Sequence, residues 1–99
     1  MSLVIQWDAA KAKSNEVKHR VSFEEAETVF ADTLGWIYAD PLHSQYERRE
    51  ILIGESNRHR LLLVCFTELS EGYVRIFSSR EPTAHERRKY ETERGARGH

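Results

Sequence analysis

Three strand-like segments separated by two short turns occupy most of the second half of the chain. They comprise residues 48–54, 60–67 and 73–79, and the residues between them include the turn-forming Asn57 and Gly72. Residues 60–66 are apolar on both alternations of a strand, which predicts a central strand covered on both faces. This half of the chain therefore predicts an antiparallel meander.

The first half of the chain and the C-terminus add helices. Asp8 and Ser22 are predicted N-caps, and Ser22 with Glu25 forms a capping box; Thr83 and Glu86 repeat that pattern near the end. The predicted elements are a strand at 4–7, helices at 9–19 and from 23 to about 32–35, strands at 35–39, 48–54, 60–67 and 73–79, and a helix from 84 to about 93 that ends before Gly95 and Gly98. The order β-α-α-β-β-β-β-α predicts an α+β fold, an antiparallel sheet covered by helices, in a single domain of residues 1–99.

Several classes of protein are excluded by what the sequence lacks. No apolar stretch approaches the roughly 20 residues of a membrane span, and no secretory signal precedes the first strand. The lone Cys65 excludes an internal disulfide, and five histidines (His19, His43, His59, His85, His99) lack metal-ligand spacing. Glycine-rich phosphate loops and nucleophile-elbow serines are also missing. We therefore expect a cytoplasmic protein without metal or cofactor.

Charge is distributed unevenly, although the formal net charge is −1. Residues 1–20 carry four basic and two acidic side chains, residues 21–40 carry five acidic and no basic ones, and residues 75–99 carry seven basic and four acidic ones. Basic ends of this kind are compatible with a nucleic-acid partner at one face. The acidic second helix is a poor RNA surface, so RNA is expected on the opposite side.

Basic side chains on loops and strand ends are the remaining candidates for chemistry. Cleavage of RNA by its own 2′-hydroxyl needs a base, an acid and cations that stabilise the phosphorane. Arginine suits the last task because its planar fork binds phosphate oxygens in pairs. The candidates are Arg48, Arg49, Arg75 and Arg80, with Lys18 and His19 at the end of the first helix.

Each candidate also has a structural interpretation. Lys18 and His19 suit a helix C-terminus, where positive charge complements the helix dipole. Arg48 and Arg49 are flanked by Glu47 and Glu50, and on a solvent-exposed strand face they would form ion pairs with these glutamates. Tyr90 is one of the few apolar residues of the last helix and is the expected packing anchor of that helix.

Short motifs along nearly the whole chain resemble one known family. They are Trp7-Asp8, Lys11, Asn15, Lys18-His19, Val21 to Ala26, Val29 to Asp32, Asp40-Pro41, Glu47-Arg48-Arg49, Ile53-Gly54, Arg75 to Arg80, Thr83, Glu86-Arg87-Arg88 and Tyr90-Glu91. In this order and spacing they resemble the BrnT-type toxins. Two positions depart from the family pattern: Arg20 stands where the family usually has glycine, and Glu81-Pro82 follows Arg80.

The resemblance implies a function and partners. BrnT proteins are ribonuclease toxins of bacterial type II toxin–antitoxin pairs with a RelE-like fold, so we expect metal-independent RNA cleavage, inhibited translation and growth arrest. It also implies a BrnA-like antitoxin, through which alone the complex contacts DNA. A non-catalytic RNA- or antitoxin-binding module that acts as a corepressor subunit is the alternative, and a purely structural partner protein is a third.

The resemblance also implies roles for individual residues. Arg80 and Arg49 are expected to stabilise the pentavalent phosphate, and Arg75 to position the RNA backbone. His19 is the preferred acid–base group. The remaining expectations are Glu47 and Tyr90 as further catalytic candidates, and Lys18 and Arg48 as RNA-binding residues.

Overall fold

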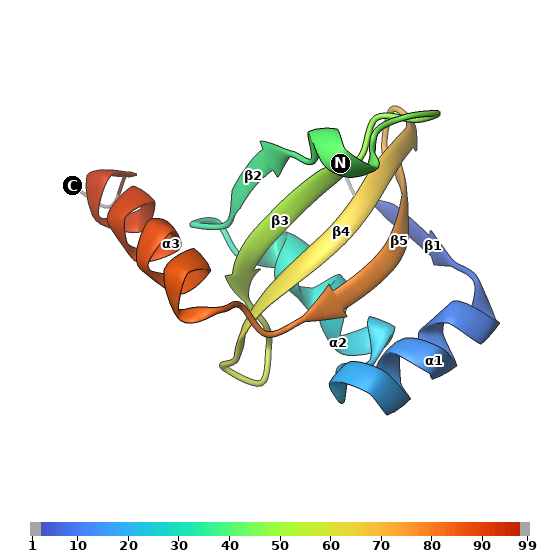
Figure 1. The fold of residues 1–99 in the computed structure, drawn as a ribbon, viewed down its shortest axis with the longest axis horizontal. Coiled ribbons are helices and arrows are strands. Elements are labelled where there is room, and N and C mark those ends of the chain that lie inside the picture. Colours follow the sequence, from blue (N-terminus) through green and yellow to red (C-terminus); the bar gives the residue numbers. More distant parts are fainter. Residues whose placement is uncertain (1–2, 98–99) are drawn as a thin grey trace.

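Five strands form one sheet, with α1 and α2 packed against one face and α3 beside the other (Figure 1). The computed structural model describes residues 3–97. The elements, in the predicted order, are β1 (Val4–Trp7), α1 (Ala9–His19), α2 (Phe23–Thr28), the 3₁₀ turn η1 (Val29–Ala31), β2 (Trp36–Ala39), the 3₁₀ turn η2 (Pro41–His43), β3 (Glu50–Glu55), β4 (Leu61–Ser70), β5 (Tyr73–Arg80) and α3 (Ala84–Arg97).

The sheet is mixed, with strand order β1-β5-β4-β3-β2. Strands β2 to β5 form the predicted antiparallel meander. β1 instead runs parallel to β5, with Val4 opposite Tyr73 and Trp7 opposite Ile76. The prediction of a wholly antiparallel sheet is therefore wrong. The chain leaves β1 through two helices and returns beside it only after three further strands, and a strand of four residues carries no signal for so distant a partner.

Side chains of the central strands alternate between two apolar layers. One layer joins the sheet to α1 and α2 and includes Phe23, Leu62, Val64 and Ile76. The other contains Ile53, Leu63 and Tyr90, with partly buried side chains of β2 around them. β4 is the middle strand and contributes to both layers, as its sequence predicts.

The predicted N-caps of α1 and α2 are confirmed, but one capping box forms only in part. Asp8 and Ser22 each accept a hydrogen bond from a backbone N–H of the first turn, at 3.0 Å. The Glu25 carboxylate does not return to the N-cap. It accepts a hydrogen bond from the Ser56 hydroxyl (2.7 Å) and pairs with the Arg60 guanidinium. Glu25 therefore ties α2 to the turn between β3 and β4.

The turn after α1 forms although arginine stands where glycine is favoured. Arg20 adopts φ 59° and ψ 34°, the left-handed conformation common at helix C-termini. Its backbone N–H donates to the Glu16 carbonyl at 2.9 Å, which closes the helix. The absence of glycine at this position therefore does not prevent the helix end.

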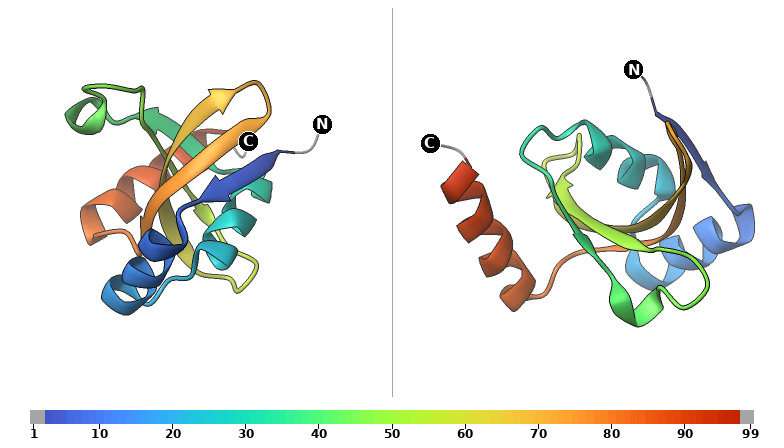
Figure 2. Two further views of the ribbon diagram at one scale, coloured as in Figure 1. Left: turned by 90° about the vertical axis from the view of Figure 1, so that its right-hand side faces the viewer. Right: turned by 90° about the horizontal axis from the view of Figure 1, so that it is seen from above.

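Tyr90 attaches α3 to the sheet. Its side chain is 2% exposed and packs with Ile53 and Leu63, and the helix lies beside β2 (Figure 2). The helix continues to Arg97, beyond the predicted end, because a glycine such as Gly95 weakens a helix without breaking it. Gly98 lies outside the described residues. No helix within residues 3–97 is both long and apolar enough to cross a membrane.

Candidate active site

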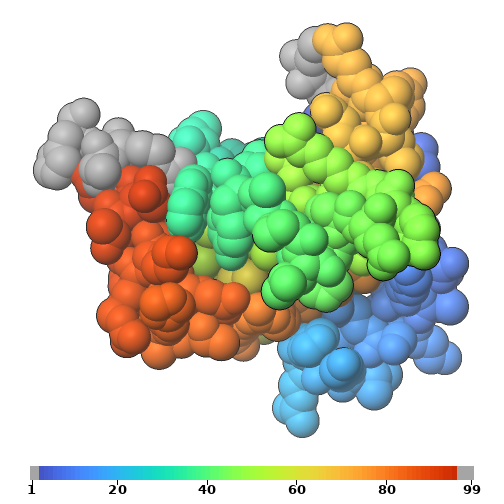
Figure 3. Space-filling view, turned by 45° about the horizontal axis from the view of Figure 1, so that its top comes forward, coloured from blue at the N-terminus to red at the C-terminus, as the bar shows by residue number. Residues whose placement is uncertain are grey.

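A cavity of about 600 Å³ lies on the face of the sheet that α3 covers only in part. Its apolar floor is formed by Ile51, Leu63, Cys65 and Phe77, and its walls come from α1, η2 and the end of β5. Figure 3 shows the segment around η2, in green, between α3 and α1. The acidic helix α2 packs on the other face of the sheet.

A β-bulge in β5 places two consecutive side chains on this floor. Cys65 pairs with Ser78 and Phe66 pairs with Ile76, so Phe77 is an extra residue without a partner in β4. An extra residue restarts the alternation of a strand. Phe77, Ser78 and Arg80 therefore all line the cavity.

Arg49 lies over the aromatic floor. Its guanidinium carbon is 3.9 Å from the centroid of the Phe77 ring, and Lys11 Nζ is 5.2 Å from the same centroid. Arg49 Nε is buried and has no hydrogen-bond partner among the described residues. Nη2 lies 3.5 Å from Glu47 Oε1, which is a loose ion pair. Because the Arg49 side chain is 28% exposed while Nε is closed to solvent, the terminal nitrogens are the donors that an anion in the cavity can reach.

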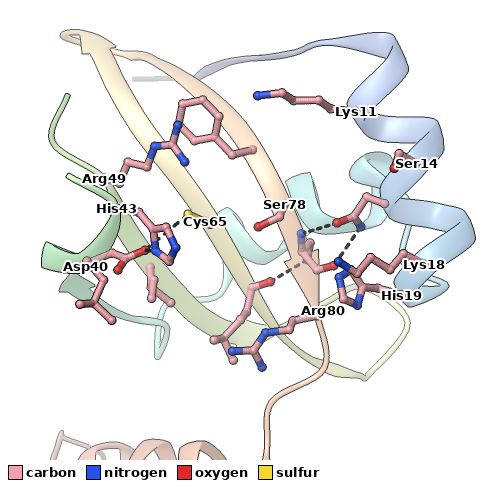
Figure 4. A pocket seen from close by; sticks show the side chains of 16 residues that line it. Lys11, Ser14, Lys18, His19, Asp40, His43, Arg49, Cys65, Ser78 and Arg80 are labelled. Carbon is pink, nitrogen blue, oxygen red and sulfur yellow. Dashed lines mark hydrogen bonds and ion pairs between the residues drawn. The ribbon is translucent and has the colours of Figure 1, made fainter. Parts of the chain in front are cut away.

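Lys18 and His19, from the last turn of α1, form the wall opposite Arg49 (Figure 4). Buried Asn15 fixes this wall to β5. Its amide donates to the carbonyls of Val21 and Ser79 at 2.9 Å, and its oxygen accepts from the Ser79 N–H at 3.0 Å. The two bonds to Ser79 join residues 64 positions apart, so the sequence alone does not assign Asn15 this structural role.

Arg80 lines the cavity but is already paired. Its two terminal nitrogens bind the Glu86 carboxylate at 2.8 and 2.9 Å. The hydrogen bonds from Arg80 lower the pKa of Glu86 to about 2, and the same bonds raise the pKa of Arg80. Glu86 also completes the predicted capping box with Thr83. A phosphate that binds Arg80 must therefore compete with the first turn of α3.

Four of the expected site residues lie outside the lining of the cavity. Glu47 pairs with Arg49, Arg48 is exposed, and Arg75 shares the face of Phe77 two residues earlier on β5. Tyr90 is buried between α3, to which it belongs, and the sheet, with its hydroxyl 3.5 Å from Asp32 Oδ2. The structure thus brings together Lys18, His19, Arg49 and Arg80, but not the other four.

The cavity also contains a pair that sequence reasoning missed. His43 Nδ1 lies 2.8 Å from Asp40 Oδ2, and both residues line the wall formed by η2 (Figure 4). The sequence predicts a turn at Asp40-Pro41 followed by a loop at 42–46, and it gives His43 no evident partner. The signal that could have found the pair is the spacing of Asp40 and His43, because a single 3₁₀ turn brings side chains three positions apart onto one side.

Metal ligands do not gather in the described part of the chain: no three His, Cys, Asp or Glu side chains there could hold an ion together. His99 lies outside the described residues. Four cationic side chains within residues 3–97 line the cavity, those of Lys11, Lys18, Arg49 and Arg80, and such donors suit an anionic ligand.

Comparisons with known proteins point to one family. The family model described as "Ribonuclease toxin, BrnT, of type II toxin-antitoxin system" matches residues 7–86. A crystal structure of the Brucella abortus ribonuclease toxin BrnT superposes with a TM-score of 0.60 at 23% sequence identity, covering 83% of this chain and 99% of that one. No curated protein matches the sequence significantly. The structural likeness shows a shared fold.

Proposed function

This chain belongs to the BrnT family of ribonuclease toxins of type II toxin–antitoxin systems, and we propose that it is an endoribonuclease that cleaves RNA in the cationic cavity without a metal. The observation that carries the proposal is the convergence of Lys18, His19, Arg49 and Arg80 around one cavity from α1, the segment before β3 and the end of β5. RNA reaches this face without crossing the acidic helix α2.

The proposed reaction is attack of the 2′-hydroxyl on the adjacent phosphorus. A bond forms between O2′ and phosphorus, the bond to O5′ breaks, and the products are a 2′,3′-cyclic phosphate and a 5′-hydroxyl. Negative charge builds on the non-bridging oxygens, where preorganised donors are most effective. Arg49 supplies a stacked guanidinium for this charge, and Lys18 holds the phosphate from the opposite wall.

Arg80 has a more conditional role in this proposal. Its ion pair with Glu86 leaves it next to the cavity, with a side chain 40% exposed. An RNA phosphate that displaces or shares this carboxylate gains a second arginine. Arg75 and exposed Arg48 then contact the RNA backbone beyond the cavity, and Glu47 acts by orienting Arg49.

His19 is the proposed acid for the leaving O5′. It lines the cavity on the wall opposite Arg49 and is partly exposed, so it is accessible to substrate. Proton donation to the leaving oxygen is a step that histidine commonly performs, and general acid–base catalysis contributes about 10²–10⁴-fold.

The experiment that tests this proposal is RNA cleavage by the purified protein in excess EDTA. We expect cleavage to continue and its products to carry 2′,3′-cyclic phosphate ends, because the proposed site uses only side chains. Parallel reactions with free single-stranded RNA and with translating ribosomes separate direct cleavage from ribosome-dependent cleavage. Activity that disappears with EDTA and returns with a divalent cation would contradict the metal-independent mechanism.

The non-catalytic alternative, an RNA- or antitoxin-binding corepressor subunit, is favoured by one observation. Glu86 occupies both terminal nitrogens of Arg80, which reduces the cationic donors available for transition-state charge. In the same assay a binding module leaves RNA intact in both reactions while it still shifts the RNA on a native gel.

Tyr90 offers a direct test of which expected residues act in catalysis. The Tyr90 side chain is 2% exposed and packs α3 against the sheet. We therefore expect Tyr90→Phe to leave the cleavage rate unchanged and Tyr90→Ala to loosen the attachment of α3. Cleavage assays and hydrogen exchange of residues 84–97 measure the two effects. If Tyr90→Phe lost much of the cleavage rate while hydrogen exchange of α3 stayed as in the wild type, the Tyr90 hydroxyl would have to take part in catalysis.

Type II membership implies an antitoxin partner. We propose that this antitoxin is BrnA-like, that it covers the cationic cavity and that it supplies all DNA contacts of the complex. Growth arrest on expression, and its relief by co-expression of the antitoxin, would support this model. A RelE-like fold, a single domain over residues 1–99 and a cytoplasmic site of action belong to the same proposal.

A further inference from the structure

His43 and Asp40 form a hydrogen-bonded pair on the wall of the cavity. His43 Nδ1 lies 2.8 Å from Asp40 Oδ2. The Asp40 side chain is 10% exposed, whereas the His43 side chain is 63% exposed. A buried carboxylate therefore holds a ring that is open to substrate.

The backbone around Asp40 is fixed by several hydrogen bonds. The Asp40 N–H donates to the Arg49 carbonyl at 2.9 Å, and the Ser44 hydroxyl donates to the Asp40 carbonyl at 2.6 Å. The Ser44 hydroxyl also accepts from the Arg49 N–H at 3.0 Å. These bonds join η2 to the start of the segment that carries Arg49, so the pair and the arginine keep a fixed relation.

The surroundings of Asp40 favour its carboxylate as the acceptor. The Cys65 Sγ lies 3.9 Å from the same Oδ2. Burial, together with the Asp40 charge, raises the pKa of the Cys65 thiol, so it stays protonated and acts as a weak donor. With the carboxylate as the acceptor of this hydrogen bond, the neutral tautomer that fits the geometry has its proton on Nδ1 and its lone pair on Nε2, at the other side of the ring.

We propose that His43, positioned by Asp40, is the general base that removes the 2′-hydroxyl proton, an inference that rests on the ribonuclease function proposed above. Nε2 takes the proton as O2′ bonds to phosphorus, and the acid on the opposite wall protonates O5′ as its bond to phosphorus breaks. A carboxylate behind a histidine stabilises the imidazolium that forms in this step. This assigns His43 to the base and leaves His19 as the acid.

The test replaces His43 with asparagine, whose side-chain amide can still donate to Asp40 but cannot take up a proton. We expect cleavage to fall by about 10²-fold without a change in melting temperature. His59→Asn is the matched control: His59 also faces a carboxylate, Glu55, at 3.4 Å, but it lies in the exposed turn between β3 and β4. This control should cleave at the wild-type rate.

A substrate with sulfur in place of O5′ separates base from acid. Its leaving group departs without protonation, so loss of the acid becomes harmless while loss of the base does not. We expect His19→Asn to cleave this substrate at close to the wild-type rate and His43→Asn to stay slow. Restoration of His43→Asn by the sulfur substrate, or its full activity on ordinary RNA, would overturn the proposal.

Asp40→Asn tests the positioning role. We expect a fall in kcat with little change in KM, and a double variant with His43→Asn that is no slower than His43→Asn alone, because both changes act on one group. Independent, additive losses would contradict positioning. If the wild-type protein itself cleaves no RNA, the proposed function fails first and the assignment of His43 fails with it.

Discussion

Replacing Arg49 with alanine is expected to slow RNA cleavage by about 10³-fold while the fold is retained. The Arg49 guanidinium carbon lies 3.9 Å from the centroid of the Phe77 ring, and the ion pair of its Nη2 with Glu47 is loose, at 3.5 Å. Stacking uses the face of the guanidinium and leaves the donors on its edge for phosphate oxygens. Because charge on those oxygens is largest in the transition state, the loss should appear in kcat more than in KM.

Single-turnover cleavage rates and the melting temperature measure this prediction. Arg49→Lys keeps the charge but loses the planar fork, so it should recover only a part of the lost rate. Arg58→Ala removes the same charge from an exposed position in the turn between β3 and β4, and it should behave as wild type. Wild-type cleavage by Arg49→Ala would remove this arginine from the mechanism and weaken the cavity as the site.

Local patterns predicted most of the elements, and long-range contacts were the part that they could not supply. Asp8 and Ser22 act as caps because an N-cap depends on residues within one turn. The parallel pairing of β1 with β5 depends on residues about 70 positions apart, for which the four residues Val4–Trp7 carry no signal. The two capping boxes illustrate the same limit, since Glu86 completes its box whereas Glu25 is diverted to Arg60.

The same contrast between local signals and contacts with other elements applies to the cavity. Lys18, His19, Arg49 and Arg80 could be named from residue type and position, because cations on loops and strand ends suit phosphate chemistry. Their partners could not: Glu86 reaches Arg80 only once the chain turns from β5 into α3, and Phe77 on β5 reaches Arg49 across β4. The sequence predicts a turn at Asp40-Pro41 and a loop at 42–46, but not the 3₁₀ turn that places His43 beside Asp40.

Arg60→Met should produce the largest loss of stability, about 3 kcal/mol in the free energy of unfolding. The Glu25 carboxylate is 5% exposed and accepts a hydrogen bond from Arg60 Nε at 2.9 Å in addition to the Nη2 bond. Removing the guanidinium leaves a buried charge whose remaining side-chain hydrogen-bond partner, among residues 3–97, is the Ser56 hydroxyl. Methionine fills a similar volume, so urea denaturation at neutral pH should report mainly the lost pairing.

Two further measurements identify the buried charge as the cause. Adding Glu25→Gln to Arg60→Met should restore part of the lost stability, because no unpaired charge is then buried. The hydrogen bonds from Arg60 lower the pKa of Glu25 from its ordinary value of 4.5. The pair therefore stabilises the folded protein fully above pH 4.5 and loses this contribution as the pH falls below it. The difference between wild type and Arg60→Met should shrink over the same range. A difference that is independent of pH would instead indicate that Arg60 acts through packing alone, through its contacts with α2 and the turn between β3 and β4.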